Sequence, residues 1–430
     1  MRPEDAAASR AQPAPHVVPK GYKQTELGVI PEGWETVSIQ QLIEGGSVVG
    51  HLDGNHGELY PRSHEFKESG VPYITANDLK GHEVDFSHCK YLSQERAATF
   101  RKGIARSGDV LFAHNATVGP TALLSTDLDY VILSTTATYY RCNPNKLNNS
   151  FLLYSLQSPL FVWQYQAIMS QSTRNQVPIT AQRKLSIILP PTLAEQEAIA
   201  EALSDADALI EGLESLIAKK RAIKQGAMQE LITDKRRLPG FEGEWVEKTI
   251  GDICRIEMGR TPPRLIKSYW GSGYKWLSIA DLNSKVITES KEEITKLAAS
   301  TMTIVPKGTL IMSFKLSLGR LGFAGCDLFT NEAICSFNNM SESAGFLYYV
   351  LGRTDFSLYG KQAVKGYTLN KESLNSIQIR LPSLDEQSAI SAVLSDMDDE
   401  IAALEGKLTK ARQVKQGMMQ ELLTGRIRLV

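Results

Sequence analysis

An internal duplication constrains this 430-residue chain more than any other feature of its sequence. Residues 195–238 align without a gap on residues 386–429 at a constant offset of 191, and 23 of the 44 aligned positions are identical. The longest shared blocks are KQGAMQEL, which begins at Lys224, and KQGMMQEL, which begins at Lys415. Self-similarity at a fixed spacing indicates that the chain folds as two related halves, each ending in the same element.

Each copy of the repeat predicts one long helix. Apolar residues alternate at spacings of four and three along both copies, which is the pattern of a coiled-coil seam. The seam positions are Ile199, Leu203, Ala206, Ile210, Leu213 and Ile217 in the first copy and Ile390, Leu394, Met397, Ile401, Leu404 and Leu408 in the second. Both helices begin with a predicted capping box, T-L-A-E from Thr192 and S-L-D-E from Ser383. We expect the two helices to pack on each other, and two surface helices with separate partners are the alternative.

The segments that precede the two helices repeat more faintly. Three anchors recur: a tryptophan after a turn (Trp34 and Trp245), a short run ending in Asp-Leu (residues 73–79 and 276–282) and a Gly-led strand (residues 108–113 and 308–313). Between these anchors the two sequences diverge almost completely. Short β-branched runs, Gly/Pro turns and late helical segments near residues 151–170 and 345–361 predict an α+β globular head in each half.

The predicted fold is therefore α+β, with two globular heads alternating with two long helices that pack as an antiparallel coiled coil, related by a pseudo-twofold internal repeat. The predicted boundaries are a disordered tail over 1–20, a first head over 21–188, a first helix over 189–238, a second head over 239–380 and a second helix over 381–430. The tail is rich in Ala and Pro and lacks the apolar core of a signal peptide. Two similar helices can present equivalent surfaces to two copies of one partner, whereas two divergent heads can recognise two different targets.

Composition excludes several classes of function. The chain has 47 Lys and Arg against 48 Asp and Glu, so it is not a polybasic nucleic-acid binder and any nucleic-acid site must be local. Residues 21–188 hold 14 basic against 15 acidic residues and residues 239–382 hold 17 against 14, so we expect weak DNA affinity from the isolated chain. No apolar run reaches the roughly 18 residues of a membrane span. Five cysteines without a CxxC pair predict a reducing cytoplasm, without disulfides or a zinc site.

Sequence motifs for catalysis are missing. Neither of the phosphate-binding loops GxxxxGK[ST] and GxGxxG occurs, and there is no N/D-P-P-Y tetrapeptide of an adenine methylase. No serine or cysteine has the context of a nucleophile. We therefore expect this chain to supply no catalytic residue.

Five motifs together carry a family resemblance. They are YKQTELGVIPEGW from Tyr22, LPPTLAEQEAI from Leu189, LPGFEGEW from Leu238, LPSLDEQSAI from Leu381 and the repeated KQGxMQEL block. In length, order and duplication, residues 21–430 resemble the DNA-specificity (S) subunits of type I restriction-modification enzymes. The residues before Tyr22 match no part of that pattern.

The resemblance implies a DNA-recognition subunit that serves in phage defence. Each head would be a target-recognition domain that reads one half of a bipartite, asymmetric site in double-stranded DNA. The helices would fix the spacer between the half-sites and dock two methyltransferase subunits, and up to two restriction and translocation subunits would join them. No cofactor is expected on this chain; S-adenosylmethionine, ATP and Mg are expected on the partner subunits.

Candidate DNA-binding residues are polar side chains on predicted loops, because Arg and Lys reach guanine edges and Asn and Gln reach adenine edges. The loop after each Gly-led strand carries His114, Asn115 and Thr117 in the first head and Lys315, Ser317 and Arg320 in the second. The loop before the last strand carries Ser172, Thr173, Arg174, Asn175 and Gln176 in the first head and Lys361, Gln362, Lys365 and Tyr367 in the second. Arg62, Arg260 and Arg264 in Gly-rich segments form a third set. Each of these residues alone is also compatible with an ordinary solvated loop.

Candidate partner-binding residues are exposed polar positions that recur between the helices. Arg221, Lys224, Gln225 and Gln229 recur as Arg412, Lys415, Gln416 and Gln420. The alternatives are simple solvation and a surface that docks the methyltransferase subunits.

Two other functional classes remain for comparison. A self-contained restriction-modification enzyme would need a methylase motif and a nuclease carboxylate cluster, and the sequence shows neither. A non-DNA-binding coiled-coil scaffold would have the same helices with heads that bind no duplex.

Overall fold

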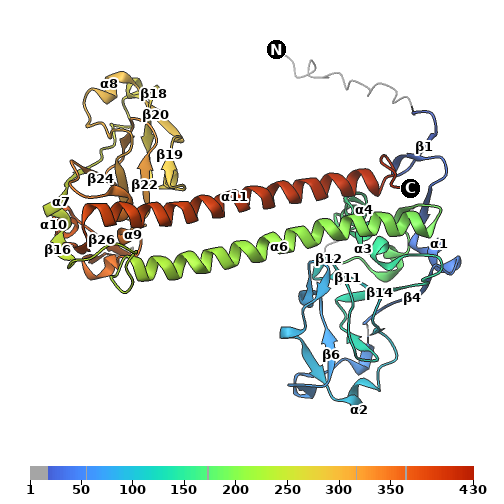
Figure 1. Cartoon of the computed structure of the whole chain (residues 1–430). Coiled ribbons are helices and arrows are strands. Elements are labelled where there is room, and N and C mark those ends of the chain that lie inside the picture. Colours follow the sequence, from blue (N-terminus) through green and yellow to red (C-terminus); the bar gives the residue numbers. More distant parts are fainter. Residues whose placement is uncertain (1–17, 55, 172–173, 316, 364–365) are drawn as a thin grey trace. The chain divides into compact units, whose positions relative to one another are not determined.

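A computed structural model gives the fold and describes residues 18–54, 56–171, 174–315, 317–363 and 366–430 (Figure 1). Most of the predicted tail, together with Ser172, Thr173 and Lys365, lies outside the described residues. No helix within these ranges is long and apolar enough to cross a membrane.

Two compact units divide the chain. The first comprises the described parts of Met1–Gly212 together with Lys407–Val430, and the second comprises Leu213–Gly406. The division falls inside both long helices, so each unit holds one head and half of each helix. The boundaries predicted from the sequence lie instead near the ends of the helices, at residues 189, 239 and 381.

The two long helices are α6 (Leu193–Leu231) and α11 (Leu384–Leu422), each of 39 residues (Figure 1). Every predicted seam residue is buried or half-buried, and Leu203 and Leu394 are fully buried. The coiled-coil periodicity predicted from the repeat is therefore confirmed.

Within each unit the two helix segments run antiparallel. In the first unit, Glu195 in the first turn of α6 pairs with Arg428, which lies beyond the end of α11, at 2.6 Å. In the second unit, Glu386 in the first turn of α11 pairs with Arg237, which lies beyond the end of α6. The start of one helix thus contacts the end of the other in both units, as predicted.

These two glutamates correct the predicted capping boxes. The hydroxyls of Thr192 and Ser383 do accept hydrogen bonds from the N–H groups of Glu195 and Glu386, at 3.2 and 3.4 Å. The glutamate carboxylates, however, bind the arginines described above. A buried carboxylate gains more from a charged guanidinium than from a single backbone N–H, which explains the difference.

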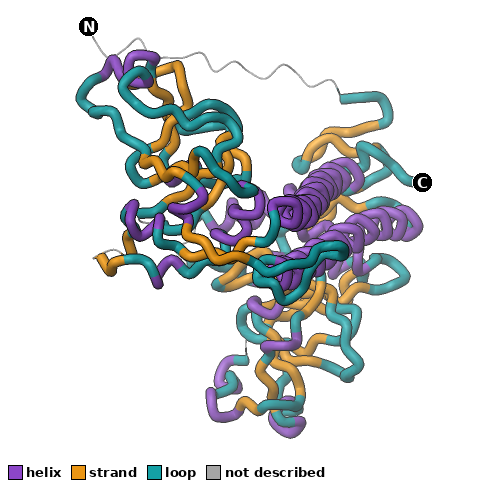
Figure 2. Tube along the Cα trace, turned by 60° about the vertical axis from the view of Figure 1, so that its left-hand side comes forward, coloured by secondary structure: helices purple, strands orange, loops and turns teal. Residues whose placement is uncertain are grey.

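The first head contains a four-stranded and a five-stranded sheet. Figure 2 shows the strands of both heads in orange. An antiparallel sheet has the order β12-β11-β14-β4, with β4 Val48–Asp53, β11 Val110–Asn115, β12 Thr117–Leu123 and β14 Ala137–Cys142. A mixed sheet has the order β10-β13-β6-β9-β5, with β5 Phe66–Lys67, β6 Val71–Ile74, β9 Lys90–Leu92, β10 Ile104–Ala105 and β13 Val131–Leu133.

Short elements surround these sheets. Two-stranded pairs are β1 Tyr22–Thr25 with β2 Gly28–Pro31, β3 Glu35–Ser38 with β15 Ser186–Leu189, and β7 Leu79–Lys80 with β8 Glu83–Val84. The helices are α1 Ile39–Glu44, α2 Gln94–Ala97, α3 Asn149–Gln157, α4 Pro159–Met169 and α5 Ile179–Gln182. One buried cluster joins Trp34, Phe112 and Phe151 of the head to Leu203 and Leu422 of the long helices, so this head is packed onto its helix segments.

The second head repeats this plan. A five-stranded sheet has the order β17-β24-β21-β22-β19, with β17 Arg255–Met258, β19 Val286–Ile287, β21 Leu310–Ser313, β22 Leu321–Ala324 and β24 Ile334–Asn338. A three-stranded sheet has the order β20-β18-β23, with β18 Trp270–Leu277, β20 Glu292–Ile294 and β23 Phe329–Thr330. The shorter elements are β16 Val246–Thr249 with β27 Gln378–Leu381, β25 Lys361–Ala363 with β26 Gly366–Thr368, α7 Ile250–Ile253, α8 Lys296–Ala299, α9 Ala344–Leu351 and α10 Lys371–Asn375.

Strand pairing confirms that the heads are equivalent despite their divergent sequences. In the first head β13 pairs in parallel with β6 at Ile132 and Tyr73, and in the second β23 pairs in parallel with β18 at Phe329 and Trp276. The late helical segments differ in length, however. The first head has α3 and α4, whereas in the second head α9 ends at its C-cap, Gly352, and a short 3-10 helix, Phe356–Leu358, follows.

Candidate nucleic-acid interface

The first two predicted loop sets of the first head form one continuous surface. The carbonyl of His114 accepts a hydrogen bond from the N–H of Val177 at 2.8 Å, and the N–H of Ala116 donates to the carbonyl of Asn175 at 3.0 Å. The side-chain amide of Asn175 donates to the carbonyl of Ala116 at 2.7 Å. Residues 114–117 and 174–176, distant in sequence, therefore lie side by side.

The strands of this hairpin extend further than the sequence predicts. β11 continues through Asn115 and β12 begins at Thr117, so the turn is the single residue Ala116, whose φ is 64°. His114 consequently lies in a strand with 6% of its surface exposed, and burial lowers the pKa of its imidazole. A buried neutral ring is not the exposed loop side chain that the sequence indicates.

The remaining members of this surface reach solvent to different degrees. Thr117, Arg174 and Asn175 are exposed, whereas Asn115 and Gln176 are half-buried. This surface is rich in amides and carries one guanidinium.

The second head brings its two loop sets together by the same contact. The N–H of Leu369, which follows β26, donates to the carbonyl of Phe314, which follows β21, at 3.1 Å. This bond is the counterpart of the one between Val177 and His114. Lys361, Gln362 and Tyr367 belong to the β25–β26 hairpin, where the sequence predicts a loop.

Two cations of this second surface lie on the loop between β21 and β22. The Lys315 ammonium lies 5.2 Å from the centre of the Phe314 ring, and Lys315 and Ser317 are half-buried. Arg320 is exposed, and its backbone N–H donates to the hydroxyl of Ser313 at 3.1 Å. The second surface is therefore more cationic than the first.

A glycine packed against an aromatic ring positions each hairpin. Gly119 has φ of +117°, and a Cβ there would lie 2.7 Å from the Tyr165 hydroxyl. Gly319 has φ of +78°, and a Cβ there would lie 2.7 Å from the Phe356 ring. Only glycine adopts such backbone conformations without strain, so both hairpins are anchored in the same way.

The three arginines of the third predicted set differ in their contacts. Arg62 and Arg260 are exposed. Arg264 instead pairs with Glu292 at 2.5 Å and stacks on Trp270, with its guanidinium carbon 3.9 Å from the ring centre. This pairing and stacking fix Arg264 to the second head.

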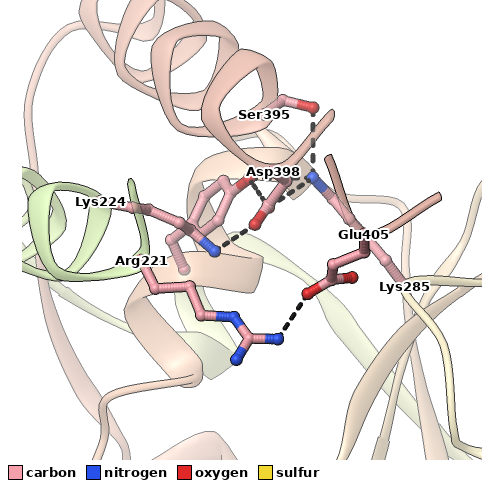
Figure 3. A network of polar contacts seen from close by, with 7 residues as sticks. Arg221, Lys224, Lys285, Ser395, Asp398 and Glu405 are labelled. Atoms are coloured by element: carbon pink, nitrogen blue, oxygen red, sulfur yellow. Dashed lines mark hydrogen bonds and ion pairs between the residues drawn. The ribbon is translucent and has the colours of Figure 1, made fainter. Parts of the chain in front are cut away.

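On the long helices of the second unit, Lys224 belongs to a network of polar contacts around Asp398 (Figure 3). Its ammonium donates to the carboxylate of Asp398, which also accepts bonds from the Tyr349 hydroxyl at 2.6 Å and from Lys285 at 3.1 Å. Arg221 pairs with Glu405 at 2.5 Å. Burial alone would raise the pKa of Asp398, but the hydrogen bonds from its three partners outweigh that effect and lower the pKa.

The first unit contains the equivalent network around Asp207. Lys415 pairs with this carboxylate at 2.5 Å, the Tyr154 hydroxyl donates to it at 2.9 Å, and His82 lies 2.8 Å away. Here too burial opposes ionisation, but the bonds from His82 and Lys415 lower the pKa of Asp207. The recurrence of Lys224 and Lys415 therefore has an intramolecular cause, whereas the sequence alone leaves simple solvation and partner docking as the alternatives.

The other recurring helix residues face solvent. Gln225, Gln229, Arg412, Gln416 and Gln420 are exposed. Beside them the exposed aliphatic residue Ile223 (47%) recurs as Val414 (51%), and Gly226 recurs as Gly417. A Cβ at either glycine would meet no atom within 4 Å. We call these two sets, Ile223-Gln225-Gly226-Gln229 and Val414-Gln416-Gly417-Gln420, the glycine faces.

Comparison with known proteins identifies the family. The family model described as a type I restriction modification DNA specificity domain matches residues 31–220 and again residues 242–413. A protein named as the MjaX specificity subunit of a type I restriction enzyme, from Methanocaldococcus jannaschii, is 28% identical over 95% of this chain and 97% of its own length. The MjaIX specificity subunit of the same organism is 32% identical over 39% of this chain and 40% of its own.

Solved structures share the fold. The S subunit of a type I restriction-modification system from M. genitalium superimposes with a TM-score of 0.57 at 15% identity, covering 90% of this chain and 96% of that one. A chain from work on complex assembly and conformational transition of the type I R-M system gives a TM-score of 0.56 at 20% identity, covering 93% of this chain and 99% of that one. Because the family model matches both halves, the chain belongs to the DNA-specificity subunits of type I restriction-modification systems, which are non-catalytic components.

Proposed function

We propose that each head of this specificity subunit reads one half of a bipartite, asymmetric DNA site. The observation that carries this proposal is a pair of surfaces with the same backbone construction and different side chains. The bond between Val177 and His114 in the first head has its counterpart between Leu369 and Phe314 in the second. Equivalent placement with divergent chemistry is what two readers of different half-sites require.

The side chains on the two surfaces favour different bases. Asn175 and Gln176 in the first head offer amides, which pair with adenine edges, and Arg174 is exposed beside them. Lys315 and Arg320 in the second head offer cations, which pair with guanine edges. The two half-sites should therefore differ in composition.

The two glycine faces are the proposed docking surfaces for two methyltransferase subunits. A glycine inside a helix destabilises it by roughly 1 kcal/mol relative to alanine. Neither Gly226 nor Gly417 is required by an atom of its own chain, because the space around each is open. A partner backbone that approaches closely at both places would explain why both helices contain this glycine beside exposed glutamines.

The long helices are the proposed spacer element. Each is continuous over 39 residues and belongs to both units. In the assembled complex, which would act in the cytoplasm, the partner subunits would bind S-adenosylmethionine, ATP and Mg and perform the chemistry. Up to two restriction subunits would complete it.

Selection of DNA from a random duplex library tests this function. The full chain, assembled with the methyltransferase of its own system, should enrich duplexes with two short, unlike blocks at a fixed separation. Enrichment of one block, or of two identical blocks, would contradict two independent readers. Failure to enrich any duplex would favour the alternative of a non-DNA-binding coiled-coil scaffold.

A further inference from the structure

A basic cavity lies in the first head, and its two cations, Arg101 and Lys102, are not among the DNA-binding candidates predicted from the sequence. Its volume is 380 Å³, and it is lined by His56, Gly57, Leu59, Arg101 and Lys102. Arg101 and Lys102 are exposed, and among the described residues neither side chain has a hydrogen-bond or ion-pair partner. They precede β10, a strand that the sequence does not reveal.

The walls of this cavity are fixed by close backbone contacts. Gly103 has φ of +63°, and a Cβ there would lie 2.7 Å from the Cα of Gly54. A Cβ on Gly54 would lie 2.1 Å from the carbonyl oxygen of Leu133. The two loops therefore touch at glycines and leave no room for other residues.

Side chains hold the same loops in place. The Nε2 of His56 lies 2.7 Å from the carbonyl of Leu133, and burial lowers the pKa of this imidazole, so it adds no charge at neutral pH. Arg96 donates to the carbonyl of Leu59 and to Glu65, both at 2.6 Å. The Arg96 guanidinium thus holds the loop in place through its bonds to Leu59 and Glu65. The side chains of Arg101 and Lys102 are therefore the cations available to a ligand.

The second head has a cation at the equivalent place, but on the other loop. Gly259 is the counterpart of Gly54, since a Cβ there would lie 2.2 Å from the carbonyl oxygen of Asn331. With Gly108 aligned on Gly308, the counterparts of Arg101 and Lys102 are Thr301 and Met302, which carry no charge. The exposed Arg260, directly after Gly259, supplies the cation instead.

We propose that Arg101 and Lys102 form a binding site for DNA backbone phosphate in the first head, with Arg260 in the corresponding role in the second. This proposal rests on the function proposed above. A phosphate is the ligand that matches two unpaired cations whose lining neighbours include no carboxylate. A cation at one place in the fold, supplied by unrelated loops, suits positioning on the backbone more than reading of a base edge.

The test measures the salt dependence of duplex binding by the full chain assembled with its methyltransferase. The double variant Arg101→Ala/Lys102→Ala should weaken binding to a site-bearing duplex and to an unrelated duplex by the same factor. Each lost phosphate contact should reduce the slope of log K against log salt by about 0.9, so the slope should fall by roughly 1 to 2. The selected motif should stay the same.

Two further variants control this measurement. Lys67→Ala/Lys80→Ala removes two exposed cations of the same head outside the cavity and should leave the slope nearly unchanged. Arg101→Lys/Lys102→Arg keeps both charges and should keep the slope. If the wild-type complex selects a motif but the alanine variant retains the full slope, or changes the motif, the phosphate site is refuted while the proposed function stands. If the wild type binds no duplex, both proposals fail.

Discussion

Asp207 of α6 and Asp398 of α11 occupy the same position of the internal repeat, and each carboxylate ties the head of its own unit to both long helices. Asp207 binds Lys415 of the opposite helix and Tyr154 of α3, which belongs to the head. Asp398 binds Lys224, the counterpart of Lys415 (Figure 3). It also binds Tyr349 of α9, the counterpart of Tyr154. In each unit, one buried or half-buried aspartate thus links the relative position of the two long helices to the packing of the head against them.

This coupling predicts loss of stability in acid. The pKa of Asp398 and Asp207 is lowered in the folded chain, so the unfolded state binds more protons and stability falls as pH decreases. The stabilisation should be complete above the ordinary pKa of 3.8 and disappear as pH falls through the lower folded pKa. Melting curves from pH 7 to pH 3 should show a shallower acid loss for Asp398→Asn than for the wild type. The exposed Asp399→Asn is the matched control, and a loss in Asp398→Asn parallel to the wild type would contradict the account.

The two networks also predict unequal effects of removing their lysines. Lys224→Ala leaves Asp398 with a second cation, Lys285 at 3.1 Å. Lys415→Ala leaves Asp207 with the His82 imidazole at 2.8 Å and the Tyr154 hydroxyl at 2.9 Å, without a second lysine among its partners in the described residues. Hydrogen bonds to charged groups contribute about 1.5–3 kcal/mol, so we expect Lys415→Ala to reach this range and Lys224→Ala to fall below it.

Denaturant unfolding of each variant measures this difference. The exposed Lys407→Ala should leave the unfolding free energy nearly unchanged and serves as the control for removal of a helix cation. Equal losses for the two network lysines would show that Lys285 does not compensate.

The glycine faces predict a trade between stability and assembly. Gly226→Ala and Gly417→Ala should each raise the free energy of unfolding by up to about 1 kcal/mol, because alanine favours the helix and the space is open. The same variants should reduce co-purification with the methyltransferase. Gly212→Ala is the matched control: it is also helical with open space, but its counterpart in the repeat is Ala403. It should stabilise α6 and leave assembly intact, and a similar loss of assembly in all three would refute the docking surface.

The base-reading surfaces predict effects confined to one half-site. Asn175→Ala/Gln176→Ala should relax selection in one block of the motif only, and Lys315→Ala/Arg320→Ala in the other. A lost direct contact to a base edge costs about 1–3 kcal/mol of discrimination. Motif selection with each variant complex measures this, and equal weakening on all duplexes would identify phosphate contacts instead.

Sequence patterns predicted the parts of the fold that depend on periodicity and repetition. The seam from Ile199 to Ile217 is buried or half-buried as predicted. The predicted antiparallel order is shown by the contacts between the start of each long helix and the end of the other. The ends of the strands could not be predicted as well, because β-strand propensity does not show that β11 continues through His114 to Asn115. The pairing of Glu195 with Arg428 joins residues 233 apart, and no local pattern records such a contact.

The candidate site shows the same division. Alignment of the heads on Gly108 and Gly308 located the hairpins that carry Asn115 and Lys315. It could not locate Arg101 and Lys102, because their counterparts in the second head are uncharged and the matching cation lies on another loop. Lys224 and Lys415 recur because of an internal ion pair, and only the contacts distinguish that cause from partner binding.

Genome-wide adenine methylation tests the central claim most directly, in cells with this gene, without it, and with the Lys315→Ala/Arg320→Ala variant. The two-reader account predicts that one motif of two unlike blocks at a fixed gap is methylated with the gene and lost without it. It also predicts that the variant relaxes one block while the other block and the gap stay unchanged. A motif that relaxes in both blocks, or whose gap changes, would contradict the account.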